Sequence, residues 1–273
     1  MSVEKLMRRA ARAVKEPAAI PAGVPIRVGV DLGTAFTVIF VTDEHGQPLA
    51  GATTFADVVR DGVVWDFAGA QRVVRELREK LERATGRSLH HGAVTIPPAV
   101  DQSNHRAHRY VIEGAGIDCD AVVDETTAAN TVLGIRDGAV VDIGGGTTGI
   151  AILDDGEIVA NYDEPSGGTH MSLVLAGALK IPYEEAEKLK RKRSRHAEFL
   201  PIVSPVLEKV STIVSDAVRS HNVQQIVLAG GTSSFTGIEE IMTRITGVPS
   251  RVAPQPMLVT PLGVTSHAHL ITD

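Results

Sequence analysis

The sequence predicts an α/β protein made of two similar lobes, each with a mixed β-sheet covered by helices on both faces. Apolar, β-branched segments alternate with segments of helical periodicity over most of the 273 residues. The segments 28–41 and 139–153 also repeat one pattern at an offset of 111 positions. Aromatic residues make up only 4% of the chain, so the cores must be aliphatic.

The elements follow in order from the periodicity of their apolar residues. A helix at 3–15 precedes a Pro/Ala-rich linker at 16–25. Strands are predicted at 26–32, 37–42, 92–98, 120–125, 138–142, 148–153, 157–162 and 225–230. Further helices are predicted at 68–86, 101–116, to about 133 after the fourth strand, and at 169–179, 184–193, 198–220, 236–245 and 262–270.

The repeat places an aspartate, glycines and threonines between two apolar strands in each lobe. "VGVDLGTAFTVIFV" contains Asp31 and "AVVDIGGGTTGIAIL" contains Asp142. Glycines expose backbone N–H groups that can bind an anion, and threonine hydroxyls add donors. Two carboxylates about 4 Å apart repel by about 4 kcal/mol, and a divalent cation reverses that sign. The pattern therefore favours Mg-nucleotide in a cleft between the lobes, with two ordinary hairpins as the alternative.

Five segments, spread in the same order over residues 27–270, resemble the motifs of the actin-like ATPase superfamily, which includes actin, DnaK-type chaperones, MreB and sugar kinases. "DLGTAFT" and "DIGGGTTG" are similar to its two phosphate loops, and "VVDETTAANTVLG" to its connecting segment. "IVLAGGTSSFTGIEEIM" resembles the adenosine motif, and "PLGVTSHAHL" the last connecting helix. The resemblance implies two RNase H-like lobes at 26–136 and 137–260, with a connecting helix at 261–273 returning to the first lobe.

The resemblance assigns a role to each matching position. Asp31 and Asp142 would hold Mg²⁺ through water, and Glu125 would orient or activate the attacking water. Residues of the two phosphate loops would cradle the phosphates of ATP or ADP, namely Gly33, Thr34, Ala35, Gly144, Gly145, Gly146 and Thr147. Residues near the ribose and base would be Glu187, Lys190, Arg191, Gly230, Gly231 and Thr232.

Departures from the chaperones predict weak affinity and slow hydrolysis. Ser234 stands where chaperones carry an arginine stacked on the base, and Thr126 replaces a proline of the connector. Residues 43–67 are too few for the upper subdomain, and the lysine that chaperones use in hydrolysis has no counterpart. Catalysis, where it occurs, would rest on electrostatics and water positioning.

Within the superfamily, the segments 56–70, 140–152, 184–191, 227–231 and 260–263 resemble the EutJ family. This implies a chaperone-like accessory protein of ethanolamine utilisation, with microcompartment shell or cargo proteins as partners. Two alternatives stay open, a nucleotide-binding assembly protein related to MreB and FtsA, and a small-molecule kinase, which the short chain disfavours. The oligomeric state also stays open.

Composition excludes several classes. The single Cys119 allows no intramolecular disulfide, and no apolar stretch is long enough to span a membrane. We therefore expect a cytoplasmic protein. A net charge of −6 argues against a nucleic-acid partner, although the run 188–196 is basic. His105 and His108 lack the further ligands that a metal site needs.

The N-terminal helix carries a weak apolar stripe formed by Val3, Met7, Ala10 and Val14. One interpretation is an inert, disordered leader. The other is a docking tag that binds a shell protein or cargo enzyme through this stripe.

Overall fold

The computed structural model describes residues 1–60, 62–98 and 102–272, and these divide into two compact units. Unit 1 comprises Met1–Gly134 and Leu258–Asp273, and unit 2 comprises Ile135–Met257. The chain thus crosses between the units twice, after Gly134 and after Met257. In the described part, no helix has the length and apolar character needed to cross a membrane.

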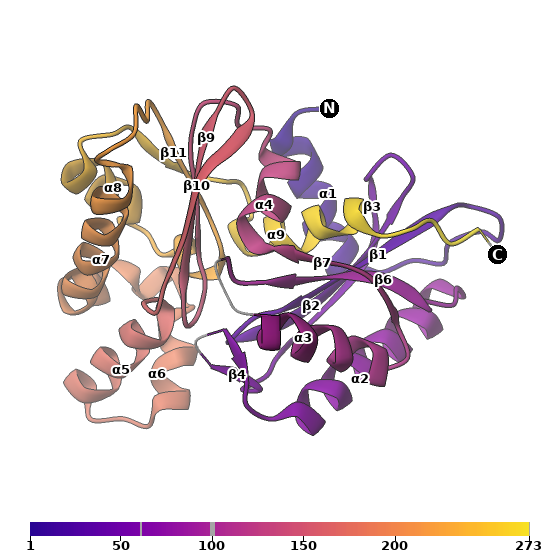
Figure 1. The fold of residues 1–273 in the computed structure, drawn as a ribbon. Coiled ribbons are helices and arrows are strands. Elements are labelled where there is room, and N and C mark those ends of the chain that lie inside the picture. Colours follow the sequence, from indigo (N-terminus) through magenta and orange to yellow (C-terminus); the bar gives the residue numbers. More distant parts are fainter. Residues whose placement is uncertain (61, 99–101, 273) are drawn as a thin grey trace. The chain divides into compact units, whose positions relative to one another are not determined.

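Unit 1 is built on a five-stranded sheet with the strand order β3-β2-β1-β6-β7. Its strands and helices are α1 (Val3–Lys15), β1 (Ile26–Leu32), β2 (Phe36–Asp43), β3 (Pro48–Phe55), β4 (Val59–Arg60), β5 (Val63–Val64), α2 (Phe67–Thr85), β6 (His91–Ile96), α3 (Gln102–Gly114), β7 (Asp118–Asp124), α4 (Glu125–Leu133), α9 (Val259–Gly263) and the 3-10 helix η4 (Val264–His267). Figure 1 shows α2 and α3 on one face of this sheet, and α4 and α9 on the other.

Unit 2 repeats the same topology with the order β10-β9-β8-β11-β12. Its strands and helices are β8 (Gly138–Ile143), β9 (Thr148–Asp154), β10 (Glu157–Glu164), α5 (Gly168–Leu179), α6 (Tyr183–Lys190), η1 (Arg193–Arg195), α7 (His196–Val218), β11 (Ile226–Ala229), η2 (Gly231–Ser234), α8 (Ile238–Thr246) and β12 (Ser250–Val252). The central strand of each sheet pairs antiparallel with the strand that follows it and parallel with its other neighbour. The predicted α/β class, with mixed sheets flanked by helices, is confirmed.

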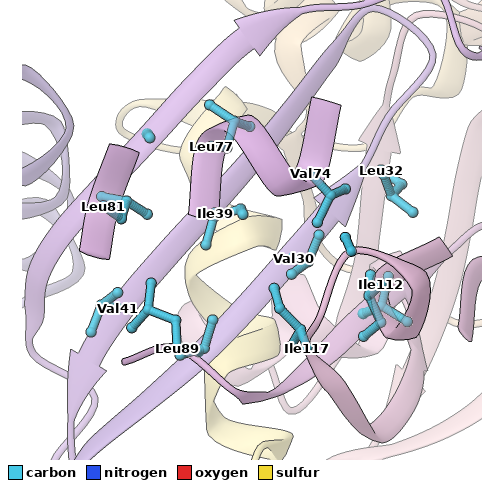
Figure 2. Close-up of a cluster of buried hydrophobic side chains, with 14 of the residues drawn as sticks. Val30, Leu32, Ile39, Val41, Val74, Leu77, Leu81, Leu89, Ile112 and Ile117 are labelled. Carbon is cyan, nitrogen blue, oxygen red and sulfur yellow. The ribbon is translucent and has the colours of Figure 1, made fainter. Parts of the chain in front are cut away.

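The main core of unit 1 lies between the sheet and α2 and α3. Val74, Leu77 and Leu81 of α2 recur at three- and four-residue spacing and point toward the sheet (Figure 2). They meet Val30 of β1 and Ile39 of β2, both fully buried (Figure 2). Alternation along β1 therefore sends Val30 into this core and leaves its neighbour Asp31 on the opposite face.

The second face of the unit 1 sheet is covered by α4, α9 and η4. A Cβ on Gly29 would lie 2.6 Å from Val264 Cγ1, so the strand needs a glycine where η4 passes. Similarly, a Cβ on Gly263 would lie 1.8 Å from the carbonyl oxygen of Ala128. The glycine of the Pro-Leu-Gly segment thus permits a close crossing of α9 over α4.

The N-terminal helix is neither a disordered leader nor a docking tag, and both interpretations of it are wrong. Met7 and Ala10 are fully buried, because the apolar stripe of α1 packs on β3 of the same unit. Gly51 of β3 makes room for this packing, since its Cβ would lie 2.8 Å from Val14. The linker is also held, with the Arg87 side chain donating to the carbonyl of Val24 at 2.7 Å.

Further differences concern segments that carry little periodic signal, among them the two-residue strands β4 and β5. Strand β3 was not predicted, because the turn residues at 43–48 lead directly into a segment rich in Ala, Gly and Thr. Strand β12 has three residues, too few for a periodic pattern. The helix predicted over 262–270 ends earlier, at His267, and Ile271 instead forms a β-bridge with Ile26.

Candidate functional site

The two segments of the sequence repeat form the same turn in both units. In unit 1 the amide of Gly33 donates to the carbonyl of Phe36 at 3.0 Å. In unit 2 the amide of Gly144 donates to the carbonyl of Thr147 at 3.0 Å. We call residues 33–36 the first glycine turn and residues 144–147 the second glycine turn. The offset of 111 positions seen in the sequence therefore also relates the hydrogen bonds.

Each turn holds backbone amides that are available to a ligand. Within the described part of the chain, the amides of Thr34 and Ala35 donate no hydrogen bond to the protein. The same holds, among the described residues, for the amides of Gly145 and Gly146. Successive unpaired amides in a turn form a concave site that suits an anion. Both turns thus have the donor set that a phosphate group requires.

Asp31 lies immediately before the first glycine turn, near the carboxyl end of β1. It is half-buried, and the hydroxyl of Thr95 on the neighbouring β6 donates to its carboxylate. Burial raises the pKa of Asp31 to about 6, although the Thr95 hydrogen bond opposes the shift. A carboxylate in this environment gains more from a bound cation than an exposed one does. Thr95 was not predicted, since nothing in its local sequence sets it apart.

Asp142 holds the equivalent position in unit 2, and it is 5% exposed. It pairs with Ala229 of β11, so the loop after β11 passes directly over its carboxylate. Gly230 makes that approach possible, because its φ is 84° and a Cβ there would lie 2.3 Å from Asp142 Oδ1. Gly231 has open space instead, with only Met257 within 4 Å of a Cβ. A side chain is therefore excluded at Gly230 by Asp142, whereas the space at Gly231 would accept one.

Glu125 lies at the start of α4, directly after β7, and is half-buried. Asp124 caps this helix by accepting from the amide of Thr127 at 2.8 Å and from the hydroxyl of Thr126 at 2.7 Å. The strands β1, β6 and β7 run parallel, so their carboxyl ends lie side by side. Asp31, Thr95 and Glu125 therefore all lie at the carboxyl-end side of the unit 1 sheet. Unit 1 thus presents two acidic groups and one glycine turn along the same side.

A second glycine pair, which the sequence analysis missed, supports the second glycine turn. The amide of Gly168 donates to the carbonyl of Gly144 at 3.0 Å, and the amide of Thr169 donates to that of Gly145 at 2.8 Å. A Cβ on Gly167 would lie 2.7 Å from the carbonyl of Gly145. The Thr232 hydroxyl also donates to Gly144, at 2.7 Å. The consecutive glycines in "EPSGGTHM" were the available signal.

Glu187 and Lys190 form a buried ion pair beside this loop. The Lys190 ammonium group donates to Glu187 Oε2 at 2.6 Å and to the carbonyl of Gly168 at 2.9 Å. The Ser172 hydroxyl donates to the same Glu187 oxygen at 2.6 Å. Burial lowers the pKa of Lys190, against the attraction of Glu187. Arg191, by contrast, is exposed and lies 3.6 Å from Glu187. Glu187 and Lys190, two of the three predicted adenosine contacts at 187–191, are therefore buried and held by several contacts.

The donor set fits a hard cation such as Mg²⁺. Among the described residues, no group of three His, Cys, Asp or Glu side chains could hold a metal ion by itself. Mg²⁺ typically binds one or two carboxylates and takes its other ligands from water and phosphate oxygens. Asp31 and Asp142 each precede a glycine turn, and each offers one carboxylate of the kind that this mode of binding uses.

The topology and the glycine turns define the class of protein. A family model described as MreB/Mbl protein matches residues 51–192, and one described as cell division protein FtsA matches residues 139–263. The crystal structure of MreB 5 of Spiroplasma citri bound to AMPPNP has a TM-score of 0.70 over 89% of this chain and 95% of its own, at 16% identity, and it supports the fold alone. The chain is a member of the actin-like ATPase superfamily.

Closer relatives define the family. The ethanolamine utilization protein EutJ of Salmonella typhimurium is 40% identical over 96% of this chain and 92% of its own length. The crystal structure of EutJ from Carboxydothermus hydrogenoformans is 45% identical and has a TM-score of 0.91, covering 97% of this chain and 98% of its own. The chain belongs to the EutJ family.

Proposed function

We propose that the protein binds ATP and ADP with Mg²⁺, and that one nucleotide engages both glycine turns. The observation that carries this proposal is the pair of turns with unpaired amides, each following an aspartate at the carboxyl end of a central strand. A single polyphosphate offers enough anionic oxygens for both turns. Asp31 and Asp142 would hold the cation through water, which offsets the repulsion between the carboxylates.

The second half of the nucleotide would lie along unit 2. Thr232 and Gly231 would line one side of the adenosine, and Glu187 and Lys190 the other. These side chains are fixed by their contacts with Gly144, Gly168 and Ser172, so little entropy would be lost when the ligand binds. Arg191 is exposed and would close over the ligand from solvent.

We propose slow ATP hydrolysis to ADP and phosphate. Bound Mg²⁺ would neutralise charge that develops on the phosphate oxygens. Glu125 would orient the attacking water and accept its proton, because it lies at the same carboxyl-end side of the sheet as Asp31. The amides of the glycine turns would stabilise the transferred phosphoryl group.

Membership of the EutJ family supports a proposal for the biological role. We propose a cytoplasmic, chaperone-like accessory protein of ethanolamine utilisation, which acts on shell or cargo proteins of a microcompartment. Nucleotide would change the relation between the units by acting at the two chain crossings. Both crossings adjoin the helices α4 and α9 of unit 1, which pack closely at Gly263.

The test is ATP binding by calorimetry and ATP turnover for the wild type, Asp142→Ala and Glu125→Ala. Asp142→Ala should weaken Mg-ATP binding about tenfold or more, because it removes a ligand of the bound cation. Glu125→Ala should bind Mg-ATP as the wild type does and lose turnover. Normal turnover in Glu125→Ala would refute the role of Glu125, and absence of nucleotide binding by the wild type would refute the function.

The matches to MreB and FtsA models favour one alternative, a protein that binds nucleotide and acts by self-association. Light scattering with ATP, with ADP and without nucleotide distinguishes a self-associating protein from an accessory protein that does not assemble. Growth of scattering with ATP alone would support assembly, whereas a constant small particle would support the accessory role.

A further inference from the structure

His196 joins two segments of unit 2 that are far apart in the sequence. It is the first residue of α7, and it is 4% exposed. Its Nε2 lies 2.9 Å from the carbonyl oxygen of Lys190, the last residue of α6. Its Nδ1 accepts from the amide of Thr236 at 3.0 Å and lies 3.1 Å from the Thr236 hydroxyl. The ring thus bridges α6 and the loop that follows η2.

The partners dictate one state of the ring. The amide of Thr236 can only donate, so Nδ1 must be unprotonated, and the carbonyl of Lys190 can only accept, so Nε2 must carry the proton. A neutral imidazole with one tautomer satisfies both bonds. The ring also stacks on Phe235, with centroids 4.1 Å apart and planes at 21°. His196 is therefore held on three sides.

Both bridged segments lead back to the second glycine turn. The Lys190 side chain reaches Gly168, which bonds to Gly144. On the other side, Thr232 of η2 reaches the same Gly144 carbonyl. These contacts fix each segment to the second glycine turn, and His196 joins the two segments to each other through the Lys190 carbonyl and Thr236. The bridge therefore sets the width of the space between α6 and the 230–236 loop.

We propose that His196 is a positioning residue for nucleotide binding, holding α6 and the 230–236 loop at the separation that an adenosine requires. The inference rests on the proposed function, because α6 and this loop are the predicted walls of the adenosine site. His196 itself has no role in the reaction.

The bridge depends on pH. Protonation of Nδ1 would replace an acceptor by a donor facing the Thr236 amide, and the bridge would open. Burial lowers the pKa of His196 below its ordinary value, the hydrogen bond to the Lys190 carbonyl opposes this shift, and repulsion from Arg193 adds to it. The charged residues on the chain that leads to His196 are Glu184, Glu185, Glu187, Lys188 and Lys190 of α6, then Arg191 and Lys192, and Arg193 and Arg195 of η1. Glu198 is the one charged residue in the first turn of α7. The 230–236 loop carries none.

The test uses three variants that keep different parts of the ring. In His196→Asn the amide oxygen can replace Nδ1, in His196→Gln the amide nitrogen can replace Nε2, and in His196→Phe only the stacking on Phe235 remains. Calorimetry with Mg-ADP at pH 7.5 should show about a tenfold loss of affinity for His196→Phe, as expected when two hydrogen bonds are lost. His196→Asn and His196→Gln should each recover part of that loss.

Phe199→Leu is the matched control, because Phe199 is fully buried one turn further along α7. It should lower the melting temperature and leave Mg-ADP affinity unchanged. The ratio of wild-type to His196→Phe affinity should also fall toward one as the pH drops below about 6.5, the ordinary pKa of histidine. Because protonation of the nucleotide affects both proteins equally, it drops out of this ratio of affinities.

Equal Mg-ADP affinity of the wild type and all three variants would overturn the inference and leave the proposed function intact. A pH-independent affinity ratio, or an equal loss of affinity in Phe199→Leu, would also overturn it, because His196 would then act through general stability. If the wild type binds no nucleotide, the proposed function and this inference fall together. Should His196→Phe not fold, the two amide variants carry the test.

Discussion

Units 1 and 2 have sheets of the same strand order and the same glycine turn, but their outer strands differ in cover. In unit 1, β3 is largely buried, because α1 packs on it. In unit 2, the equivalent strand β10 has Ile158 and Val159 exposed, at 37% and 52%. The chain supplies one additional helix, and it covers only one of two equivalent strands.

The difference shows how an apolar stripe on a terminal helix should be interpreted. Met7 and Ala10 have the spacing of a docking helix, but α1 packs on β3 of the same unit, where Gly51 leaves room for Val14. Burial there removes apolar surface from water without the entropy cost of association. An apolar stripe on a helix therefore predicts that the stripe is buried. It does not predict whether the covering surface belongs to the same chain or to another protein.

The largest effect should come from Gly263→Ala, which tests the packing that is special to unit 1. The new Cβ would lie 1.8 Å from the Ala128 carbonyl, and helix backbone cannot move aside as a side chain can. We expect a loss of about 3 kcal/mol in the free energy of unfolding. Urea unfolding followed by Trp65 fluorescence measures it, because the only tryptophan lies in unit 1.

Gly177→Ala is its control in unit 2. Gly177 lies inside α5 with no atom within 4 Å of a Cβ, so alanine should stabilise the helix by about 0.5–1 kcal/mol. A lower free energy of unfolding for Gly263→Ala and a higher one for Gly177→Ala would support the described crossing of α9 over α4. Similar effects of the two variants would contradict it.

Met7→Ala compares the covered strand with the open one. Met7 is fully buried against β3, so the substitution should cost about 2 kcal/mol and shift the Trp65 transition to lower urea. Val159→Ala on the open strand β10 should change the free energy of unfolding by less than about 0.5 kcal/mol. An unchanged transition for Met7→Ala would restore the interpretation of α1 as a free leader.

A smaller effect than that of Gly263→Ala or Met7→Ala should separate the two glycine turns. A Cβ on Gly33 would lie 2.9 Å from the Phe36 carbonyl, whereas on Gly144 it would lie 3.5 Å from the Thr147 carbonyl. Gly33→Ala should therefore cost about 1 kcal/mol more than Gly144→Ala. Thermal unfolding followed by circular dichroism gives the comparison. Equal costs would mean that the first turn relaxes more easily than its geometry indicates.

Sequence alone predicted most of the regular elements, because long strands and helices bury one face and so carry a period. It failed for β3 and β12, and for residues 268–270, where short or small-residue segments carry no such signal. In the candidate site, Asp31, Asp142 and the glycines of both turns were visible through their repeat. Thr95 and His196 were not, since each bonds to a residue distant in sequence. The consecutive glycines at 167 and 168 were a visible signal, but their partners Gly144 and Gly145 were not.

The amino-acid sequence by itself determined the two-fold pattern of this protein, because a repeated order of strand, aspartate and glycine turn is written locally. Only the tertiary structure decided that α1 covers β3, that α9 crosses α4 at Gly263, and that His196 joins α6 to the 230–236 loop. These contacts depend on shape and hydrogen-bonding partners brought together by folding, and neither is encoded in the spacing of neighbouring residues.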